Sequence, residues 1–158
     1  VQDNLGKMYS KVEYEEGYTL VFQGKFEEGL EKLLPLEEKY GDWWNLLFMI
    51  GLAYKNMGEM DKDKEYYEKI LRMKPQQVDT LVELALCEAS SLNMNRAIEL
   101  LEAAAKLKED PEILCNLGMA YLNVGNFDDA NYYIERAYEL NPEDEVTVAC
   151  KRELAKYI

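Results

Sequence analysis

The sequence contains no histidine, and this absence removes much of the chemistry on which enzymes depend. Without histidine, the usual Ser-His and Cys-His nucleophiles cannot be assembled, and most zinc sites lose a preferred ligand. The three cysteines, Cys87, Cys115 and Cys150, are spaced too widely for a metal site or a disulfide framework. No glycine-rich phosphate loop or calcium-loop pattern occurs. We therefore expect no catalytic residues, no cofactor, no metal and no enzymatic activity.

The chain also lacks long apolar runs and an even balance of charge. Its longest apolar run, residues 43–54, is interrupted by Asn45 and falls short of the roughly 20 residues that a membrane span needs. Against 31 acidic residues there are 18 basic ones, which gives a net charge of -13. Such a chain repels phosphate groups, so neither nucleic acid nor membrane is an expected partner. The odd number of cysteines, which we expect to be small core residues, favours a reducing, cytoplasmic compartment.

Three landmarks recur along the chain at a nearly constant interval. Small residues follow one another in steps of 34, 34 and 33 residues, at Gly17, Gly51, Ala85 and Gly118. Predicted helix ends keep the same steps, at Gly24, Gly58, Leu92 and Gly125. A large residue stands two positions after each of these ends, at Phe26, Met60, Met94 and Phe127. Three landmarks in one register predict four structural repeats.

Each repeat is predicted to form two helices, as residues 111–144 illustrate. The first helix has apolar residues at spacings of three and four, with Gly118 among them. A glycine inside a helix costs about 1 kcal/mol relative to alanine, so we expect Gly118 to allow a close helix contact. Gly125 is typical of a helix end, and a second helix is predicted over residues 127–140. Pro142 ends that helix, because the residue before a proline avoids the helical conformation.

The fourth repeat carries a pattern that resembles the tetratricopeptide repeat family. The matching residues are Leu117, Gly118, Tyr121, Ala130, Ile134, Ala137 and Pro142. The second repeat is similar except at Asp63, where the family prefers alanine, and the third departs at Glu88, where tyrosine is usual. The first is the weakest, because Pro35 is expected to kink or shorten its second helix. The resemblance implies an all-α fold, a right-handed superhelical array of antiparallel helix pairs.

We expect a single domain over residues 1–158, closed by a capping helix. Its apolar stripe is predicted at Val146, Ala149, Cys150, Leu154 and Tyr157, with a polar outer face at Lys151, Arg152, Glu153 and Lys156. Because the chain begins with Val1 rather than methionine, we expect it to be a processed or excised part of a longer protein. The expected boundaries are 10–43, 44–77, 78–110 and 111–144 for the repeats, and about 145–158 for the capping helix.

In the family that the chain resembles, the first helix of each pair lines a concave groove that binds peptides. The resemblance implies groove positions at Tyr14, Tyr18, Phe22, Asn45, Phe48, Met49, Leu52, Asn56, Asp79, Glu83, Leu86, Glu112, Asn116, Met119 and Asn123. The N-terminal members are mostly aromatic or apolar, as binding surfaces often are. The C-terminal members include acidic residues, in stretches without lysine or arginine at 75–95 and 109–135. An apolar and partly basic protein or peptide is therefore the expected partner.

Some of these groove positions have a purely structural alternative. Phe48 and Leu52 are also suited to packing between adjacent first helices, and the asparagines to plain exposed surface. Co-chaperone members of the family hold an acidic peptide's C-terminal carboxylate with lysine, asparagine and arginine. The corresponding residues here are Tyr14, Tyr18, Met49, Asp79 and Glu83, so we expect no binding of such peptides.

Three functional hypotheses follow from the sequence. The first is a non-enzymatic adaptor or scaffold that binds a protein or peptide in the groove. The second is a self-assembling structural module, a homo-oligomer whose groove accepts residues 1–8 or an edge helix of another copy. The third is the binding module of a larger protein whose activity resides elsewhere.

Overall fold

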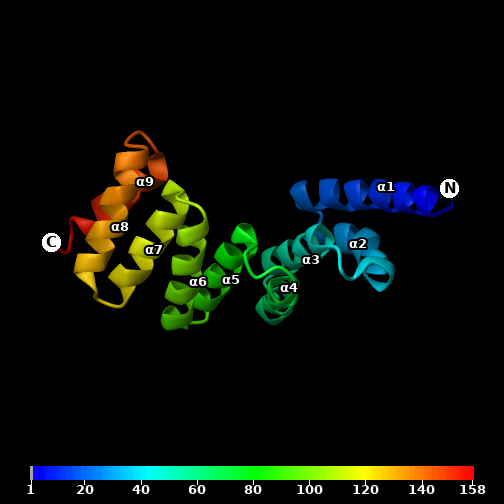
Figure 1. Ribbon diagram of the computed structural model, residues 1–158, viewed down its shortest axis with the longest axis horizontal. Coiled ribbons are helices and arrows are strands. Elements are labelled where there is room, and N and C mark those ends of the chain that lie inside the picture. The colour runs from blue at the N-terminus through cyan, green and yellow to red at the C-terminus, as the bar shows by residue number, and fades with distance from the viewer. Residues whose placement is uncertain (1) are drawn as a thin grey trace. The chain divides into compact units, whose positions relative to one another are not determined.

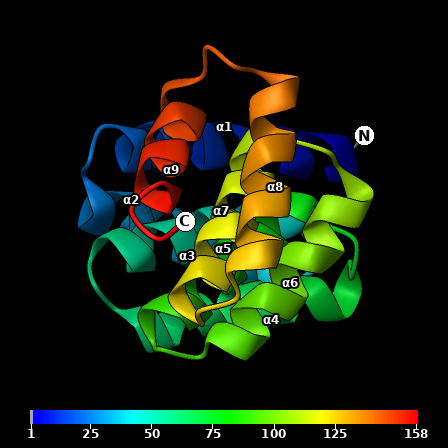
Figure 2. The same cartoon turned by 90° about the vertical axis from the view of Figure 1, so that its left-hand side faces the viewer.

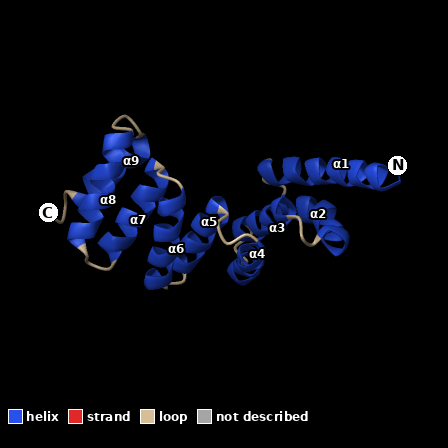
Figure 3. Ribbon diagram, in the orientation of Figure 1, coloured by secondary structure: helices blue, strands red, loops and turns tan. Residues whose placement is uncertain are grey.

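The fold is helical throughout the part of the chain that is described. The computed structural model describes the backbone of residues 2–158 and the side chains of residues 11–158, and within these residues it contains helices and loops but no strand (Figure 1, Figure 3). It divides into two compact units, Val1–Pro75 and Gln76–Ile158, here called the N-terminal and the C-terminal unit. The N-terminal unit contains α1 (Gln2–Phe22), α2 (Phe26–Tyr40), α3 (Trp44–Asn56) and α4 (Met60–Met73). The C-terminal unit contains α5 (Val78–Ser90), α6 (Met94–Leu107), α7 (Pro111–Asn123), α8 (Phe127–Leu140) and α9 (Glu145–Leu154).

The helices form antiparallel pairs, and a common turn ends the first helix of every pair. In the turn after α1, the Gly24 amide donates to the Val21 carbonyl and the Lys25 amide donates to the Leu20 carbonyl. This is the hydrogen-bond pattern of a Schellman motif, which requires a left-handed residue at its centre. Glycines meet that requirement in three of the four turns, with φ angles of 79° to 80° at Gly24, Gly58 and Gly125.

Leu92 takes the left-handed position in the remaining turn, with φ 65°. The Asn93 amide still donates to the Glu88 carbonyl, so the turn keeps the hydrogen bond of the other three. A left-handed conformation costs an L-residue with a Cβ about 1–2 kcal/mol. Because the Leu92 side chain is 84% exposed, burial offsets little of this cost.

We expect Leu92→Gly to stabilise the protein by about 0.5–1 kcal/mol. The substitution removes the left-handed strain, and glycine's larger loss of chain entropy cancels part of the gain. The measurement is the urea midpoint followed by circular dichroism. Gly125→Leu, the reciprocal change at the matching turn, should destabilise the protein by a similar amount. A Leu92→Gly variant less stable than the wild type would contradict this explanation.

The two helices of a pair meet where small residues let them approach closely. A Cβ atom added to Gly17 would lie 2.5 Å from Leu33 Cδ2, and one added to Gly51 would lie 2.7 Å from Tyr67 Cε1. The corresponding contact in the C-terminal unit is between Gly118 and Ile134. These distances are shorter than carbon atoms tolerate, so the pairing depends on glycine at these positions. The predicted fold class, an all-α arrangement of antiparallel helix pairs, is confirmed, whereas the single domain over residues 1–158 stays a prediction.

The predicted shortening of the second helix of the first repeat is wrong. Helix α2 runs unbroken from Phe26 to Tyr40 with Pro35 inside it. Proline removes one backbone donor, which in a regular helix would bond to the carbonyl of Glu31. Both Pro35 and Glu31 are exposed, so water can satisfy that carbonyl and the helix continues.

Glu88 replaces the usual tyrosine of the third repeat with a buried carboxylate. The Asn93 side-chain amide donates to Glu88 Oε2 at 2.8 Å, and Arg96 Nε lies 3.6 Å from Glu88 Oε1. Buried carboxylates are tolerated only when they are paired in this way. The family's tyrosine is retained in the fourth repeat, where Tyr121 stacks on Tyr133 with ring centroids 5.7 Å apart.

Helix α9 packs against α7 and α8 (Figure 2). The predicted inward stripe is right at Cys150 and Leu154 but wrong at its other three positions. The predicted stripe included Val146, Ala149 and Tyr157, and all three are exposed. The buried residues are Thr147 and Leu154, with Cys150 half-buried between them. Thr147 can be buried because its hydroxyl donates to the N-cap carboxylate of Asp144 at 2.8 Å. A polar residue thus takes an inner position that hydrophobic periodicity assigned to valine and alanine.

Candidate protein-binding surface

A row of three aromatic rings, two of them exposed, lies along α1. Tyr14, Tyr18 and Phe22 are spaced four residues apart, so they lie on one face of the helix. The ring centroids of Tyr14 and Tyr18 are 6.1 Å apart, and those of Tyr18 and Phe22 are 4.5 Å apart. Tyr18 is 41% exposed and Phe22 is 67% exposed. We call Tyr14, Tyr18 and Phe22 the aromatic row.

Trp43 supports the inner end of the aromatic row. Its ring lies 4.5 Å from that of Tyr14, and both residues pack against the hydrophobic core of the N-terminal unit. Burial, and secondarily the neighbouring Tyr18, raises the pKa of the Tyr14 hydroxyl above its usual value. Sequence reasoning missed Trp43 because this residue is the N-cap of α3 and lies outside the predicted first-helix positions. Its residue type is a signal that could have identified it, because tryptophan is enriched in binding hot spots.

Helix α3 contributes partly buried residues rather than an open surface. Phe48 is half-buried, with its ring 5.9 Å from Tyr67 and 6.2 Å from Trp44. Leu52 packs against the core, in line with the structural alternative considered for it. Asn45 is half-buried, and Asn56 is exposed with its amide donating to the Leu52 carbonyl at 2.8 Å.

The groove position predicted for Met49 must be corrected. Its side chain is only 3% exposed and lies in the core cluster with Val21 and Leu30, between α3 and the first helix pair. Helices α1 and α2 both contact α3, and residues of both helices lie in the cluster that contains Met49. Met49 is therefore a packing residue of the N-terminal unit.

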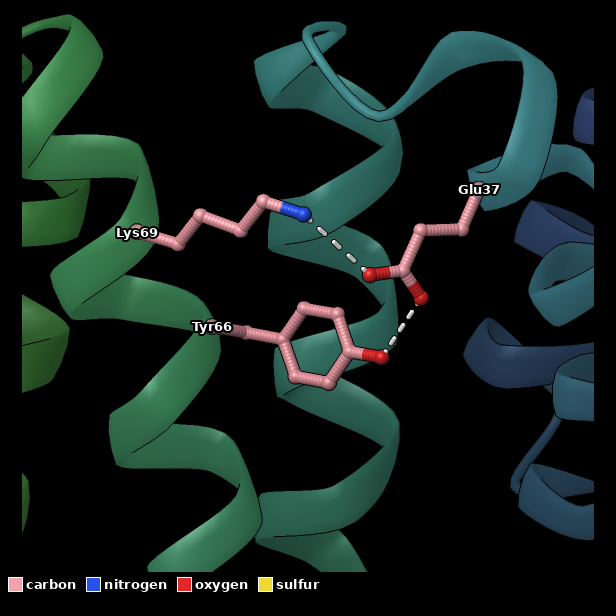
Figure 4. Close-up of polar contacts among 3 residues, drawn as sticks. All are labelled: Glu37, Tyr66 and Lys69. Carbon is pink, nitrogen blue, oxygen red and sulfur yellow. Dashed lines mark hydrogen bonds and ion pairs between the residues drawn. The ribbon is translucent and has the colours of Figure 1, made fainter.

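Contacts between α2 and α4, the second helices of the first two pairs, also help to position α3. Tyr66 of α4 donates to Glu37 Oε2 of α2 at 2.6 Å, and Lys69 Nζ lies 3.4 Å from Glu37 Oε1 (Figure 4). The Tyr66 ring also stacks on Tyr54 of α3, with centroids 5.9 Å apart. Burial, followed by the hydrogen bond to Glu37, raises the pKa of the Tyr66 hydroxyl. Tyr66 of α4 therefore contacts both α2 and α3, and these contacts fix the position of α3 in the N-terminal unit.

In the C-terminal unit, the predicted positions differ in exposure. On α5, Asp79 is exposed, and Glu83 and Leu86 are half-buried. On α7, Glu112 and Asn123 are exposed, and Asn116 is half-buried.

Met119, the remaining predicted position on α7, packs against the core cluster formed by Ala130, Ile134 and Leu154. Leu154 belongs to α9, which therefore covers part of the α7 face predicted to line the groove. The open part of that face in this unit is mainly polar and acidic.

The second helices of the C-terminal unit form a pocket of about 350 Å³ that sequence reasoning did not predict. The pocket lies mainly between α6 and α8, away from the predicted groove positions, and no repeat landmark identifies it. Its lining residues are Glu102, Ala105, Lys106, Glu109, Leu114, Tyr132, Tyr133 and Arg136.

Within residues 11–158, no group of three or more Cys, Asp and Glu side chains is arranged to hold a metal ion. Among the helices that the structure describes, none combines the length and apolar character that a membrane crossing requires. The side chains of residues 1–8, considered as a groove occupant in the self-assembly hypothesis, lie outside the described residues.

The tetratricopeptide repeat sequence profile matches residues 45–77 and 111–144, the second and fourth repeats. A curated relative, the photosystem I assembly protein Ycf3 of Prochlorococcus marinus (strain NATL2A), is 30% identical over 127 residues, covering 73% of each chain. The chain belongs to the tetratricopeptide repeat family. Its repeats act in the manner of that family, as a scaffold for protein–protein interaction, so protein or peptide partners are expected of it.

Solved structures of tetratricopeptide repeat proteins share the fold. MamA from Desulfovibrio magneticus RS-1 aligns with a TM-score of 0.79 and 16% identity, over 93% of both chains. YrrB, described as a tetratricopeptide repeat protein with an unusual peptide-binding site, aligns with a TM-score of 0.79 and 14% identity. That alignment covers 90% of this chain and 74% of YrrB. At this low sequence identity, the similarities show the fold but do not identify a binding surface on this chain.

Proposed function

We propose that this protein is a non-enzymatic adaptor that binds a segment of another protein on the aromatic row of its N-terminal unit. The observation that carries the proposal is the pair of contacting, exposed rings of Tyr18 and Phe22 on a helix fixed by core packing. Adjacent exposed aromatic rings form the kind of apolar patch that marks interaction sites, and aromatic residues dominate the energetics of many protein interfaces. The name of the curated relative, an assembly protein, also favours holding another protein over catalysis.

The chemistry around the aromatic row favours an apolar and partly basic partner segment. Glu13, Glu15 and Glu16 are exposed on α1, and the whole chain carries a net charge of -13. Tyrosine and phenylalanine faces attract lysine and arginine through cation–π contacts, which acidic neighbours reinforce. We expect the protein to work in a reducing, cytoplasmic compartment, because its three cysteines are free thiols.

Replacing Tyr18 and Phe22 together by alanine is expected to weaken partner binding by about 30-fold or more, the effect of losing a hot spot. Stability should change by less than about 1 kcal/mol per residue, because both side chains are exposed and lie outside the core. The measurement is capture of partners from a lysate by the wild-type chain, followed by calorimetric titration of the partner segment into wild type and variant.

Tyr132→Ala provides the matched control. Tyr132 is a 57% exposed tyrosine on α8, in the C-terminal unit. Its removal takes away an exposed ring outside the aromatic row and should leave partner binding unchanged. A partner bound equally well by the wild type and by the double variant would place the binding site elsewhere. A peptide ending in an acidic carboxylate motif should bind less tightly than one that alternates leucine and lysine, and the reverse order would contradict the proposed partner chemistry.

Light scattering separates the adaptor from the self-assembling module. The adaptor is expected to be monomeric, with its aromatic row free. If the chain instead forms an oligomer that Tyr18→Ala/Phe22→Ala dissociates, the occupant of the row is a second copy of the chain.

A further inference from the structure

Two cysteines far apart in the sequence meet where α9 packs on α7. Cys115 of α7 is 1% exposed and lies in a core cluster with Leu114 and Ala137, and Cys150 of α9 packs against the same cluster. The Cys115 sulfur also lies 3.5 Å from the hydroxyl oxygen of Thr147, which precedes Cys150 by about one turn on α9. Cys150 is half-buried, so one member of the pair is reachable from solvent and the other is not.

The polar groups around this pair come from the first turn of α9. The Thr147 hydroxyl donates to Asp144 Oδ2, so its oxygen can accept a hydrogen bond from Cys115 Sγ at 3.5 Å. The hydrogen bond from Cys150 lowers the pKa of Cys115 to about 7, and the same contact raises the pKa of Cys150. The two thiols therefore lose their protons as a coupled pair, and the deprotonated sulfur is the form that attacks a disulfide.

We propose that Cys115 and Cys150 are a modification site, a pair that forms a reversible disulfide and fastens α9 to α7. The oxidant is a low-molecular-weight disulfide such as oxidised glutathione. The exposed member, Cys150, exchanges first because the oxidant can reach it: it loses its proton, its sulfur bonds to one glutathione sulfur, and the other glutathione takes up that proton and leaves as a thiol. Cys115 then attacks the Cys150 sulfur, the mixed disulfide breaks, and the second glutathione leaves with the Cys115 proton.

The consequence for the fold is local. Helix α9 is short and buries only Thr147 and Leu154 fully, so its attachment rests on few side chains. A covalent link to α7 closes the chain between the two cysteines and removes open states of α9. Because Cys150 is half-buried, oxidised glutathione can reach its sulfur from solvent. A pair of fully buried thiols would be inaccessible to this oxidant.

The test uses the whole chain, treated with oxidised glutathione, alkylated at its remaining thiols and digested for mass spectrometry. The expected product is a Cys115–Cys150 cross-linked peptide lighter by two hydrogen atoms, with Cys87 alkylated. Hydrogen exchange of the α9 amides should slow at least about tenfold, the low end of what such a loop closure gives. Cys150→Ser should abolish both effects, and Cys87→Ser should leave both intact.

Other products would overturn the proposal. Glutathione that stays on Cys150 without conversion to the cross-link would show that the two sulfurs cannot reach bonding geometry. A cross-link through Cys87 or between chains would assign the reactivity elsewhere, and unchanged α9 exchange in the cross-linked chain would refute the fastening. If circular dichroism shows that Cys150→Ser is unfolded, Cys150→Ala, which adds no hydroxyl, replaces it.

Discussion

Replacing Tyr67 by alanine is expected to lower the free energy of unfolding by about 3–5 kcal/mol, the range found when a large buried aromatic ring is removed. Tyr67 of α4 is completely buried, and its ring lies directly beneath Gly51 of α3. The same ring lies 5.9 Å from that of Phe48. Its loss leaves a cavity where the two helices of the second pair meet, and neither backbone can collapse to fill it.

Tryptophan fluorescence provides the measurement for this unit. The only two tryptophans, Trp43 and Trp44, are in the N-terminal unit, so their signal during urea unfolding reports on it. Tyr67→Phe keeps the ring and should cost much less than Tyr67→Ala. A loss below about 1 kcal/mol in Tyr67→Ala would mean that the ring does not fill the space between α3 and α4.

In the C-terminal unit, Gly118→Ala is expected to destabilise the protein by about 1–2 kcal/mol. Alanine gains up to about 1 kcal/mol in helix propensity, but overpacking costs about 1–3 kcal/mol. The added Cβ would lie 2.5 Å from Ile134 Cγ1 and 3.2 Å from the Ala130 carbonyl oxygen. The contact with Ile134 matters most, because it is the shorter one and a β-branched side chain in a helix has little freedom to move aside.

A double-mutant cycle with Ile134→Ala tests this account. Truncating Ile134 removes the contact nearest to the added methyl group. The loss of unfolding free energy caused by Ile134→Ala should therefore be smaller by about 1–2 kcal/mol in the Gly118→Ala background than in the wild type. Circular dichroism during urea unfolding gives the four free energies. Additive effects would show that Gly118 is not selected by its contact with Ile134. The third pair provides a natural comparison, because Ala85 is tolerated there opposite Ala97 and Leu101.

Much of the candidate site could be predicted because its main residues repeat along one helix. Tyr14, Tyr18 and Phe22 follow a four-residue spacing, and the structure brings them together as that spacing predicts. Trp43 could not be assigned in the same way, since its place beside Tyr14 arises from the contact of α1 with the start of α3. Met49 was misassigned because its burial depends on the neighbouring α2, which a single-helix pattern does not include.

The sequence by itself determined the helix pairs and the turns between their helices. Residue 118 must be small and residue 125 must tolerate a left-handed backbone, and such requirements act within one repeat. Only the tertiary structure decided which faces stay open. Thr147 of α9 faces the interior and contacts Cys115 of α7. Met119 is covered by the same helix, α9, which lies beyond the repeat to which Cys115 and Met119 belong. Local hydrogen bonding and sterics are encoded in neighbouring residues, whereas burial depends on every element that packs against a surface.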